Sequence, residues 1–219
     1  MLVENNTTLE VFNDWTLRVH RPAQTPARLL LMIHGWTGDE NSMWVFVRNF
    51  PEDYLLLAPR APYSEPQGGW SWRQARPDSF ARPGLDDLRE STDALVRLVD
   101  DFSAREHIDA SQFDVMGFSQ GAALSNVLTC LYPHRIRKAG ILAGFMPSGM
   151  DDIIAQKPLL GKQIFVSHGR QDKMVPLDRA VASMSLLEQA GARITYCEAE
   201  VGHRVASKCV RGLETYFTT

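Results

Sequence analysis

The fold is decided by the stretch Phe113-Asp-Val-Met-Gly-Phe-Ser-Gln-Gly-Ala-Ala-Leu124. Its apolar start, Phe113–Met116, is typical of a buried strand, and residues 120–131 are typical of a helix. Between them stands Gly117-Phe-Ser-Gln-Gly121, a Gly-x-Ser-x-Gly pentad on a strand-to-helix turn. Such a turn strains the serine backbone and projects the hydroxyl, and the flanking glycines are needed because a Cβ there would strike neighbouring backbone. Ser119 is therefore a candidate nucleophile.

A second interpretation of the pentad is a glycine-bounded turn that happens to hold a serine. A serine hydroxyl is a weak nucleophile at neutral pH. A catalytic role therefore requires a base, an acid that orients this base, and donors for an oxyanion. The rest of the chain has to supply these groups in the matching order.

Length and composition favour an ordinary globular protein. The 219 residues suit one α/β domain over residues 1–219 with a core of its own. The net charge of −3 and the lack of a basic cluster disfavour nucleic acid or an anionic membrane as a partner. The apolar runs are too short to span a bilayer, so we expect no stable membrane insertion, and the first residues predict no signal peptide.

Three cysteines, Cys130, Cys197 and Cys209, stand in apolar surroundings. This odd number is typical of reduced, packed thiols in a cytosolic protein. None of the three occupies a strand-to-helix turn where a nucleophile would stand. The sequence thus predicts reduced cysteines and a cytoplasmic location.

Apolar runs alternate with amphipathic helical segments, which predicts a mostly parallel, doubly wound sheet with helices on both faces. A hairpin at the sheet edge is expected for Thr8–Phe12 and Thr16–His20, and a helix capped by Asn41 or Ser42 is expected after the third strand. The remaining predicted strands are Arg28–Ile33, Tyr54–Ala58, Phe113–Met116, Ala139–Ala143, Gln163–Ser167 and Ile194–Glu198, and the remaining helices are 85–102, 120–131, 176–191 and 205–216.

The candidate acid and base both follow predicted strands, at the carboxyl ends where such sheets place their functional loops. His203 follows the last strand and Asp172 the strand before it, which gives the chain order Ser…Asp…His expected of this fold. His34 and His168 also end strands, but each precedes a glycine and fits a ring that bonds loop backbone. We predict Ser119 as the nucleophile, His203 as the base and Asp172 as its orienting acid.

The oxyanion of an acyl-transfer reaction needs two backbone N–H donors, one after the nucleophile and one in the loop after the third strand. These residues are Gln120 and Trp36. The irregular segment Pro59–Gly84 is interpreted as a pocket wall; the alternative is that Trp70 and Trp72 cover edges of the core. The predicted substrate-binding residues are Trp70, Trp72, Phe118, Phe145 and Met146, with the Trp36 indole beside them.

A metal site is the competing interpretation of the same loops. His168, Asp172 and His203 together offer nitrogen and oxygen groups of the kind that ligate zinc. A metal site would leave the Gly-x-Ser-x-Gly turn unexplained. The sequence therefore predicts no metal and no cofactor.

With these residues placed, the chain resembles the α/β-hydrolase superfamily along nearly its whole length. Three segments look like its carboxylesterase/phospholipase branch, which includes acyl-protein thioesterases and bacterial esterases: Gly117-Phe-Ser-Gln-Gly121, His168-Gly-x-x-Asp172-x-x-Val-Pro176 and Gly202-His203. The resemblance implies esterase or thioesterase activity without a cofactor, through an acyl-enzyme on Ser119.

Departures from the branch concern the substrate. Ala122 replaces a second glycine after the turn, and His34-Gly-Trp-Thr-Gly-Asp39 is one residue longer than the thioesterase loop. The segment Gly68-Gly-Trp-Ser-Trp72 looks closer to bacterial esterases. Because only roughly twenty residues join the fifth and sixth main strands, we expect no separate cap domain and an open site for short to medium acyl chains.

Several functions stay open on the sequence alone. The main prediction is a serine hydrolase acting on small carboxylic esters or thioesters. A lysophospholipase, an acyl-protein thioesterase, a serine peptidase and a lactone hydrolase use the same groups. A catalytically inactive hydrolase fold that binds a ligand is the alternative from another class, because fold does not fix function.

Overall fold

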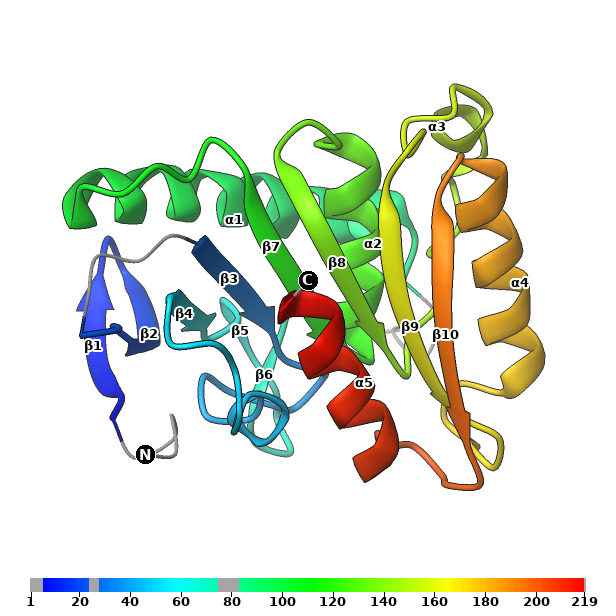
Figure 1. Cartoon of the computed structure of the whole chain (residues 1–219), viewed down its shortest axis with the longest axis horizontal. Helices are drawn as coiled ribbons and strands as arrows, with labels where there is room; N and C mark the ends of the chain where they lie inside the picture. The colour runs from blue at the N-terminus through cyan, green and yellow to red at the C-terminus, as the bar shows by residue number, and fades with distance from the viewer. Residues whose placement is uncertain (1–5, 24–27, 75–82, 219) are drawn as a thin grey trace.

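The computed structural model describes residues 6–23, 28–74 and 83–218. The first residues, for which the sequence predicts no signal peptide, and residues 75–82 of the predicted pocket wall lie outside this description. Within it, an eight-stranded sheet in the order β1-β2-β4-β3-β7-β8-β9-β10 carries helices on both faces (Figure 1). The α/β class with a mostly parallel sheet is confirmed. Its strands are β1 (Thr8–Phe12), β2 (Trp15–His20), β3 (Arg28–Ile33), β4 (Tyr54–Pro59), β7 (Phe113–Phe118), β8 (Ile136–Leu142), β9 (Gln163–Gly169) and β10 (Arg193–Ala199).

The parallel strands are apolar throughout because both of their faces are covered. In β3, Leu29, Leu31 and Ile33 pack into one core cluster. Leu30 and Met32 point to the opposite face and join a second cluster. Only the edge hairpin β1-β2 departs from the parallel pattern in the described sheet, since β2 pairs antiparallel with both β1 and β4.

The helices divide between the two faces. Helices α1, α2 and α4 contribute to the first core cluster, and α5 contributes to the second. The short helix α3, before β9, is not among the helices predicted from the sequence. In the described ranges no helix combines the length and apolar character needed to cross a bilayer. The bounds are α1 (Leu85–Glu106), α2 (Gln120–Leu131), α3 (Asp151–Ala155), α4 (Leu177–Gln189) and α5 (Ser207–Thr218).

The prediction of an α-helix after β3 is wrong. Only a 3-10 turn, η2 (Trp44–Phe46), forms there. Asn41 and Ser42 do not cap a helix; the Asn41 N–H and the Ser42 hydroxyl both bond Oδ1 of Asp39. These side-chain bonds favour a turn over a helix. The segment Met43–Phe50 instead lays its apolar side chains against the second core cluster as an irregular cover.

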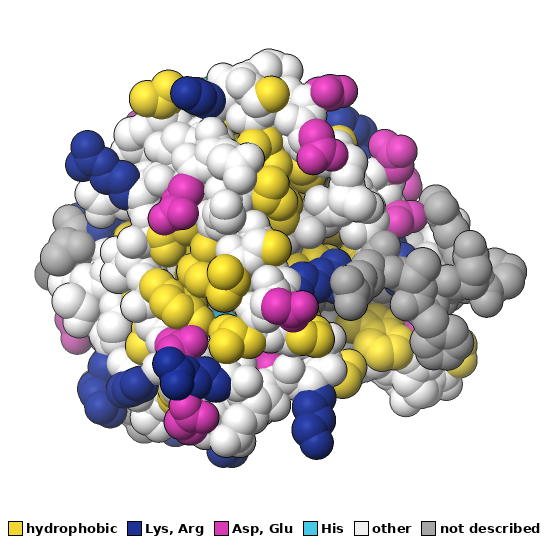
Figure 2. All heavy atoms as spheres, turned by 90° about the vertical axis from the view of Figure 1, so that its right-hand side faces the viewer, with side chains coloured by type: hydrophobic (Ala, Val, Ile, Leu, Met, Phe, Trp, Pro, Cys, Tyr) yellow, Lys and Arg dark blue, Asp and Glu magenta, His cyan; other side chains and the backbone are white. Residues whose placement is uncertain are grey.

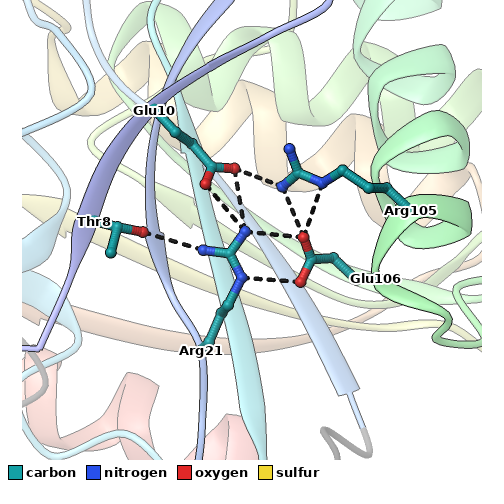
Figure 3. Close-up of polar contacts among 5 residues, drawn as sticks. All are labelled: Thr8, Glu10, Arg21, Arg105 and Glu106. Carbon is teal, nitrogen blue, oxygen red and sulfur yellow. Dashed lines mark hydrogen bonds and ion pairs between the residues drawn. The ribbon is translucent and has the colours of Figure 1, made fainter.

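The edge hairpin is tied to the end of α1 by a cluster of five side chains (Figure 3). The Arg21 guanidinium lies 2.9 Å from the Glu106 carboxylate and also pairs with Glu10. Arg105 pairs with both carboxylates. The arginines hold the pKa of Glu106 at about 2, well below its usual range. The hairpin is therefore attached to the fold by charge as well as by strand pairing.

The prediction of reduced cysteines is wrong for two of the three. Cys197 in β10 and Cys209 in α5 form a disulfide, with their Cα atoms 5.6 Å apart. Cys130 is a buried free thiol. The sequence spacing did not reveal the pair because β10 and α5 meet only through the tertiary fold.

The face that carries α4 and β10 shows a gathering of hydrophobic side chains between charged ones (Figure 2). Val181 on α4 is 52% exposed and Tyr196 on β10 is 38% exposed. Pro176, just before α4, is partly exposed. Exposed apolar side chains therefore occur at both edges of the sheet, since Leu9 and Val11 on β1 are 64% and 75% exposed.

Candidate active site

The predicted strand-to-helix turn is present. Ser119 separates β7 from α2 and has φ 55° and ψ −114°. A non-glycine residue in this region is strained and is held there by its surroundings. A Cβ on Gly117 would lie 2.2 Å from the carbonyl oxygen of Gly121, and one on Gly121 would lie 2.1 Å from that of Ile33. The two glycines thus let strand and helix approach around the serine.

The structure brings the three predicted catalytic side chains into one hydrogen-bonded row. The Ser119 Oγ lies 2.9 Å from Nε2 of His203. Nδ1 of His203 lies 2.7 Å from Oδ2 of Asp172. A carboxylate only accepts hydrogen bonds, so Nδ1–H donates to Asp172 and Nε2 accepts from the serine hydroxyl. This arrangement is suited to moving the Ser119 proton to the imidazole.

The carboxylate of Asp172 is fixed by its own loop. Its Oδ1 accepts the backbone N–H groups of Met174 and Val175, each at 2.9 Å. Nε2–H of His168 donates to the Val175 carbonyl at 2.8 Å and closes the same loop. Asp172 is buried, and its oxygens are satisfied by the N–H groups of Met174 and Val175 and by Nδ1 of His203. His168 therefore acts on loop backbone, as expected for it from the sequence.

The loop that carries His203 rests on the end of β9. A Cβ on Gly169 would lie 2.3 Å from the carbonyl oxygens of Val201 and Gly202, so only glycine lets this loop settle there. The Gln171 N–H donates to the Val201 carbonyl at 3.0 Å. The Phe118 ring lies 5.0 Å from the imidazole of His203, measured between ring centroids. The loop backbone is thus held against β9, and the Phe118 ring contacts the imidazole.

The two predicted oxyanion donors lie in segments adjoining the serine. Gln120 is the first residue of α2, and the first N–H groups of a helix have no intrahelical partner. The loop that carries Trp36 passes beside the nucleophile, since a Cβ on Gly35 would lie 3.3 Å from the Ser119 Cβ. The helix N-terminus favours negative charge at this place.

His34 fixes the peptide unit that joins Gly35 to Trp36. Its Nδ1 donates to the Gly35 carbonyl at 2.7 Å, and its Nε2 accepts the Ala61 N–H at 3.0 Å. Burial lowers the pKa of His34, which keeps the ring neutral so that Nε2 can accept. In a trans peptide the C=O of Gly35 and the N–H of Trp36 point in opposite directions. The Gly38 N–H donates to the same carbonyl at 3.0 Å, so this bond and the bond from His34 together set the direction of the Trp36 N–H.

The side chain of Gln120 holds the segment around Trp72. Its Oε1 accepts the Trp72 N–H at 3.0 Å, and its Nε2 donates to the Ser71 hydroxyl at 3.1 Å. The Trp72 indole N–H donates to the His34 carbonyl at 2.8 Å, and the Trp72 carbonyl accepts from the Ser91 hydroxyl at 2.6 Å. Trp72 is fully buried and lies in the core, which agrees with the alternative that it covers core residues and does not line a pocket. We therefore do not propose it as a substrate contact.

The other predicted pocket residues differ in exposure. Trp36 is 46% exposed on the loop beside Ser119. The Trp70 ring is partly buried, with the Arg60 guanidinium 4.9 Å from its centroid. Phe145 and Met146 are buried and their backbone is held from α2 and α4, through Asn126 and Ser183. Of the five predicted substrate contacts, Phe118 is the one whose ring lies against His203.

The side chains of the competing metal interpretation have other partners. His168 bonds a carbonyl, and both ring nitrogens of His203 belong to the row with Ser119 and Asp172. Among residues 6–23, 28–74 and 83–218, no three or more His, Cys, Asp or Glu side chains are arranged to hold a metal ion. The absence of a cofactor stays a prediction.

A hydroxyl, an imidazole and a carboxylate in a row at a strained strand-to-helix turn are the arrangement of serine hydrolases on the α/β-hydrolase fold. The profile described as Phospholipase/Carboxylesterase matches residues 15–219, and the chain belongs to this family.

Curated relatives and solved structures agree with this family. The chain is 27% identical over 178 residues to acyl-protein thioesterase 1 of Kluyveromyces lactis, covering 74% of this chain and 76% of the relative. It is 32% identical over 108 residues to carboxylesterase SOBER1 of Arabidopsis thaliana; this match spans 47% of the chain and 46% of the relative, less than half of its length. A carboxylesterase structure from Mesorhizobium loti has the same fold, with a TM-score of 0.81, 19% identity and coverage of 97% of this chain and 99% of that one. The chain is thus a hydrolase of the carboxylesterase and thioesterase type.

Proposed function

We propose that this protein hydrolyses carboxylic esters or thioesters through an acyl-enzyme on Ser119. The observation that carries the proposal is the row of hydrogen bonds from Ser119 through His203 to Asp172, at 2.9 and 2.7 Å. A row of this kind is the machinery of acyl transfer, and no cofactor is required for it.

The proposed reaction has two stages. His203 takes the Ser119 proton through Nε2 while the Oγ attacks the acyl carbon, and it then gives that proton to the departing alcohol or thiol. A water molecule, deprotonated by the same nitrogen, next releases the acid from the serine. Asp172 keeps Nδ1 protonated throughout and stabilises the imidazolium.

The oxyanion formed in each stage is assigned to the backbone N–H groups of Trp36 and Gln120. Support for this comes from the closeness of Gly35 to Ser119 and from the free N–H groups at the start of α2. The Trp36 indole and the Phe118 ring are proposed to contact substrate, since Trp36 is exposed and Phe118 flanks His203.

For the acyl group we propose a short or medium chain. Between β8 and β9 the chain forms only the five-residue helix α3, which is too small for a cap over the site. Rates on p-nitrophenyl esters of increasing chain length test this proposal. A clear preference for the longest chains would instead favour the lysophospholipase or acyl-protein thioesterase alternative.

A fluorophosphonate probe tests the proposed function directly, because it reacts with an activated serine. We expect labelling at Ser119 and ester hydrolysis, both abolished in Ser119→Ala, with an unchanged melting temperature. Ser185→Ala is the matched control, since Ser185 is an exposed serine on α4. Folded wild-type protein that neither labels nor turns over esters and thioesters would favour the ligand-binding alternative.

The cytoplasmic location also remains a proposal. Reduced cysteines are typical of the cytosol, whereas a disulfide such as Cys197–Cys209 persists mainly in oxidising compartments. Fractionation of the source cells, with thiols alkylated at lysis, tests the location and the state of the cysteines together.

A further inference from the structure

The disulfide closes the loop that carries His203. Cys197 lies in β10, Cys209 lies in the first turn of α5, and twelve positions separate them in the sequence. His203 lies in the middle of this ring. The bond therefore spans the base of the loop that holds the imidazole.

The two arms of this loop are held differently. The arm before His203 is bonded to the end of β9, through the Arg170 N–H to the Ala199 carbonyl and the Gln171 N–H to the Val201 carbonyl. The arm after His203 leads into α5, where the N–H groups of Cys209 and Val210 bond the nearby Ala206 carbonyl. Those last bonds are internal to the helix start. The disulfide is what ties this second arm covalently to the sheet.

We propose that Cys197 and Cys209 are positioning residues for His203, and that reducing their disulfide slows the chemical step. The inference rests on the proposed function of Ser119. Without the bond, the start of α5 is held against β10 by side-chain packing alone, so it can shift further and carry the imidazole with it. Catalytic geometry tolerates little displacement, and an error of about 1 Å costs up to a hundredfold in rate.

Reduction of this bond has a defined chemistry and route. Dithiothreitol supplies two electrons: one of its thiolates attacks a protein sulfur, its second thiol closes the cyclic disulfide, and Cys197 and Cys209 leave as two thiols. Cys197 is partly exposed, which gives the reagent access. Cys130 is buried and has no disulfide partner, so it does not take part.

The experiment compares the native enzyme before and after dithiothreitol, with alkylation to trap the thiols and mass spectrometry to count them. When the untreated enzyme is denatured and alkylated, we expect one alkylated cysteine. After reduction by dithiothreitol we expect three. We expect kcat on a p-nitrophenyl ester to fall roughly tenfold to a hundredfold on reduction, with KM nearly constant. Reoxidation by glutathione disulfide should restore kcat.

Two variants separate positioning from general stability. Cys197→Ala with Cys209→Ala should reproduce the low kcat in a folded protein and be insensitive to dithiothreitol, whereas Cys130→Ala should keep the full response of the native enzyme. The pH profile of kcat/KM should also shift in the double variant, because this profile reports the catalytic base in the enzyme without bound substrate. A purely structural bond would lower the melting temperature and leave both kinetic readouts unchanged.

Three results would overturn the inference: three free thiols in the untreated protein, full kcat in the reduced folded enzyme, or global unfolding on reduction. The oxidised enzyme is assayed first. If it does not react with fluorophosphonate, the proposed function fails; if it reacts and reduction changes nothing, only the positioning inference fails.

Discussion

The side-chain oxygen of Gln120 lies 3.0 Å from the backbone nitrogen of Trp72, 48 positions earlier in the chain. The residue after the candidate nucleophile therefore has two functions in the structure. Its backbone N–H is the proposed oxyanion donor, while its side chain anchors the buried end of the β5-β6 segment (Tyr63–Ser64 and Trp70–Ser71). The anchored segment in turn reaches the loop of Trp36, since the Thr37 N–H donates to the Trp70 carbonyl at 3.0 Å.

Replacing Gln120 by alanine separates these two functions. The backbone donor remains, but the buried Trp72 N–H loses its acceptor, which costs about 1–3 kcal/mol of folding free energy. We expect a lower melting temperature and a modest fall in kcat as the Trp36 loop loosens. Gln112→Ala is the control, because Gln112 is exposed and its side chain donates to the His134 carbonyl. Equal melting temperatures for the two variants would contradict the anchoring role.

Replacing Asp172 by asparagine should reverse the tautomer of His203. The N–H groups of Met174 and Val175 already select an oxygen at Oδ1, so the new amide NH₂ would face Nδ1 of His203. Nδ1 would then have to accept, Nε2 would carry the hydrogen, and the Ser119 proton would have no acceptor. We expect kcat to fall by about 10⁴-fold with little change in fold.

The control for that variant is Asp178→Asn, a carboxylate in the exposed first turn of α4. It should leave kcat within about twofold, since Asp178 is exposed, its Oδ1 accepts the Arg179 N–H, and exposed charges contribute little. Steady-state kinetics on one p-nitrophenyl ester, with circular dichroism to verify folding, measures both variants. A loss below about tenfold in Asp172→Asn would assign the acid to another residue.

His34 is expected to act through the Gly35–Trp36 peptide. His34→Ala removes the side-chain donor to the Gly35 carbonyl and leaves the Gly38 N–H as its other donor. The value of kcat should fall by about tenfold to a hundredfold, less than the loss of an oxyanion donor itself. His34→Asn retains an N–H near the position of Nδ1 and should recover part of the rate. If both variants match the wild type in kcat, the orientation of the Trp36 N–H does not depend on this ring.

The same residue gives a pH dependence of folding stability. Burial lowers the pKa of His34 below 6.5 in the folded state, so below that pH the unfolded chain binds more protons at this position. Its contribution to the free energy of unfolding therefore decreases as the pH falls below about 6.5 and down to the folded pKa. Urea unfolding at several pH values should show a shallower dependence in His34→Asn than in the wild type.

The sequence was most informative where local sterics and chain order determine structure. A Cβ on Gly117 or Gly121 would lie closer to neighbouring backbone than van der Waals distance allows, so both positions require glycine. The pentad therefore predicts the turn and its strained serine. The positions of Asp172 and His203 after consecutive parallel strands predict that they meet, because the ends of such strands lie at one edge of the sheet.

The features that the sequence did not reveal depend on tertiary neighbours. Trp72 looks like a pocket aromatic until the acceptors for its two N–H groups, on Gln120 and His34, are known. The Cys197–Cys209 pair requires knowledge of where α5 crosses β10. The turn at residues 39–42 replaces a helix because Asp39 competes for the groups that a helix cap would use.

Gly117, at the start of the turn, has no room for a side chain. In Gly117→Ala the new Cβ would lie 2.2 Å from the Gly121 carbonyl oxygen and 2.5 Å from the Ser125 hydroxyl oxygen. The backbone oxygen cannot move without shifting α2, so we expect a loss of about 3–5 kcal/mol in the free energy of unfolding, or no soluble protein.

Gly212→Ala is the matched control for this prediction. In α5 its Cβ would meet only the Phe165 ring, at 3.4 Å, an ordinary contact. Alanine also has the higher helix propensity, so this variant should be more stable than the wild type by roughly 0.5–1 kcal/mol. Chemical unfolding of both variants checks the contrast. A Gly117→Ala protein as stable as wild type would mean that strand and helix do not approach each other around Ser119 as closely as the geometry requires.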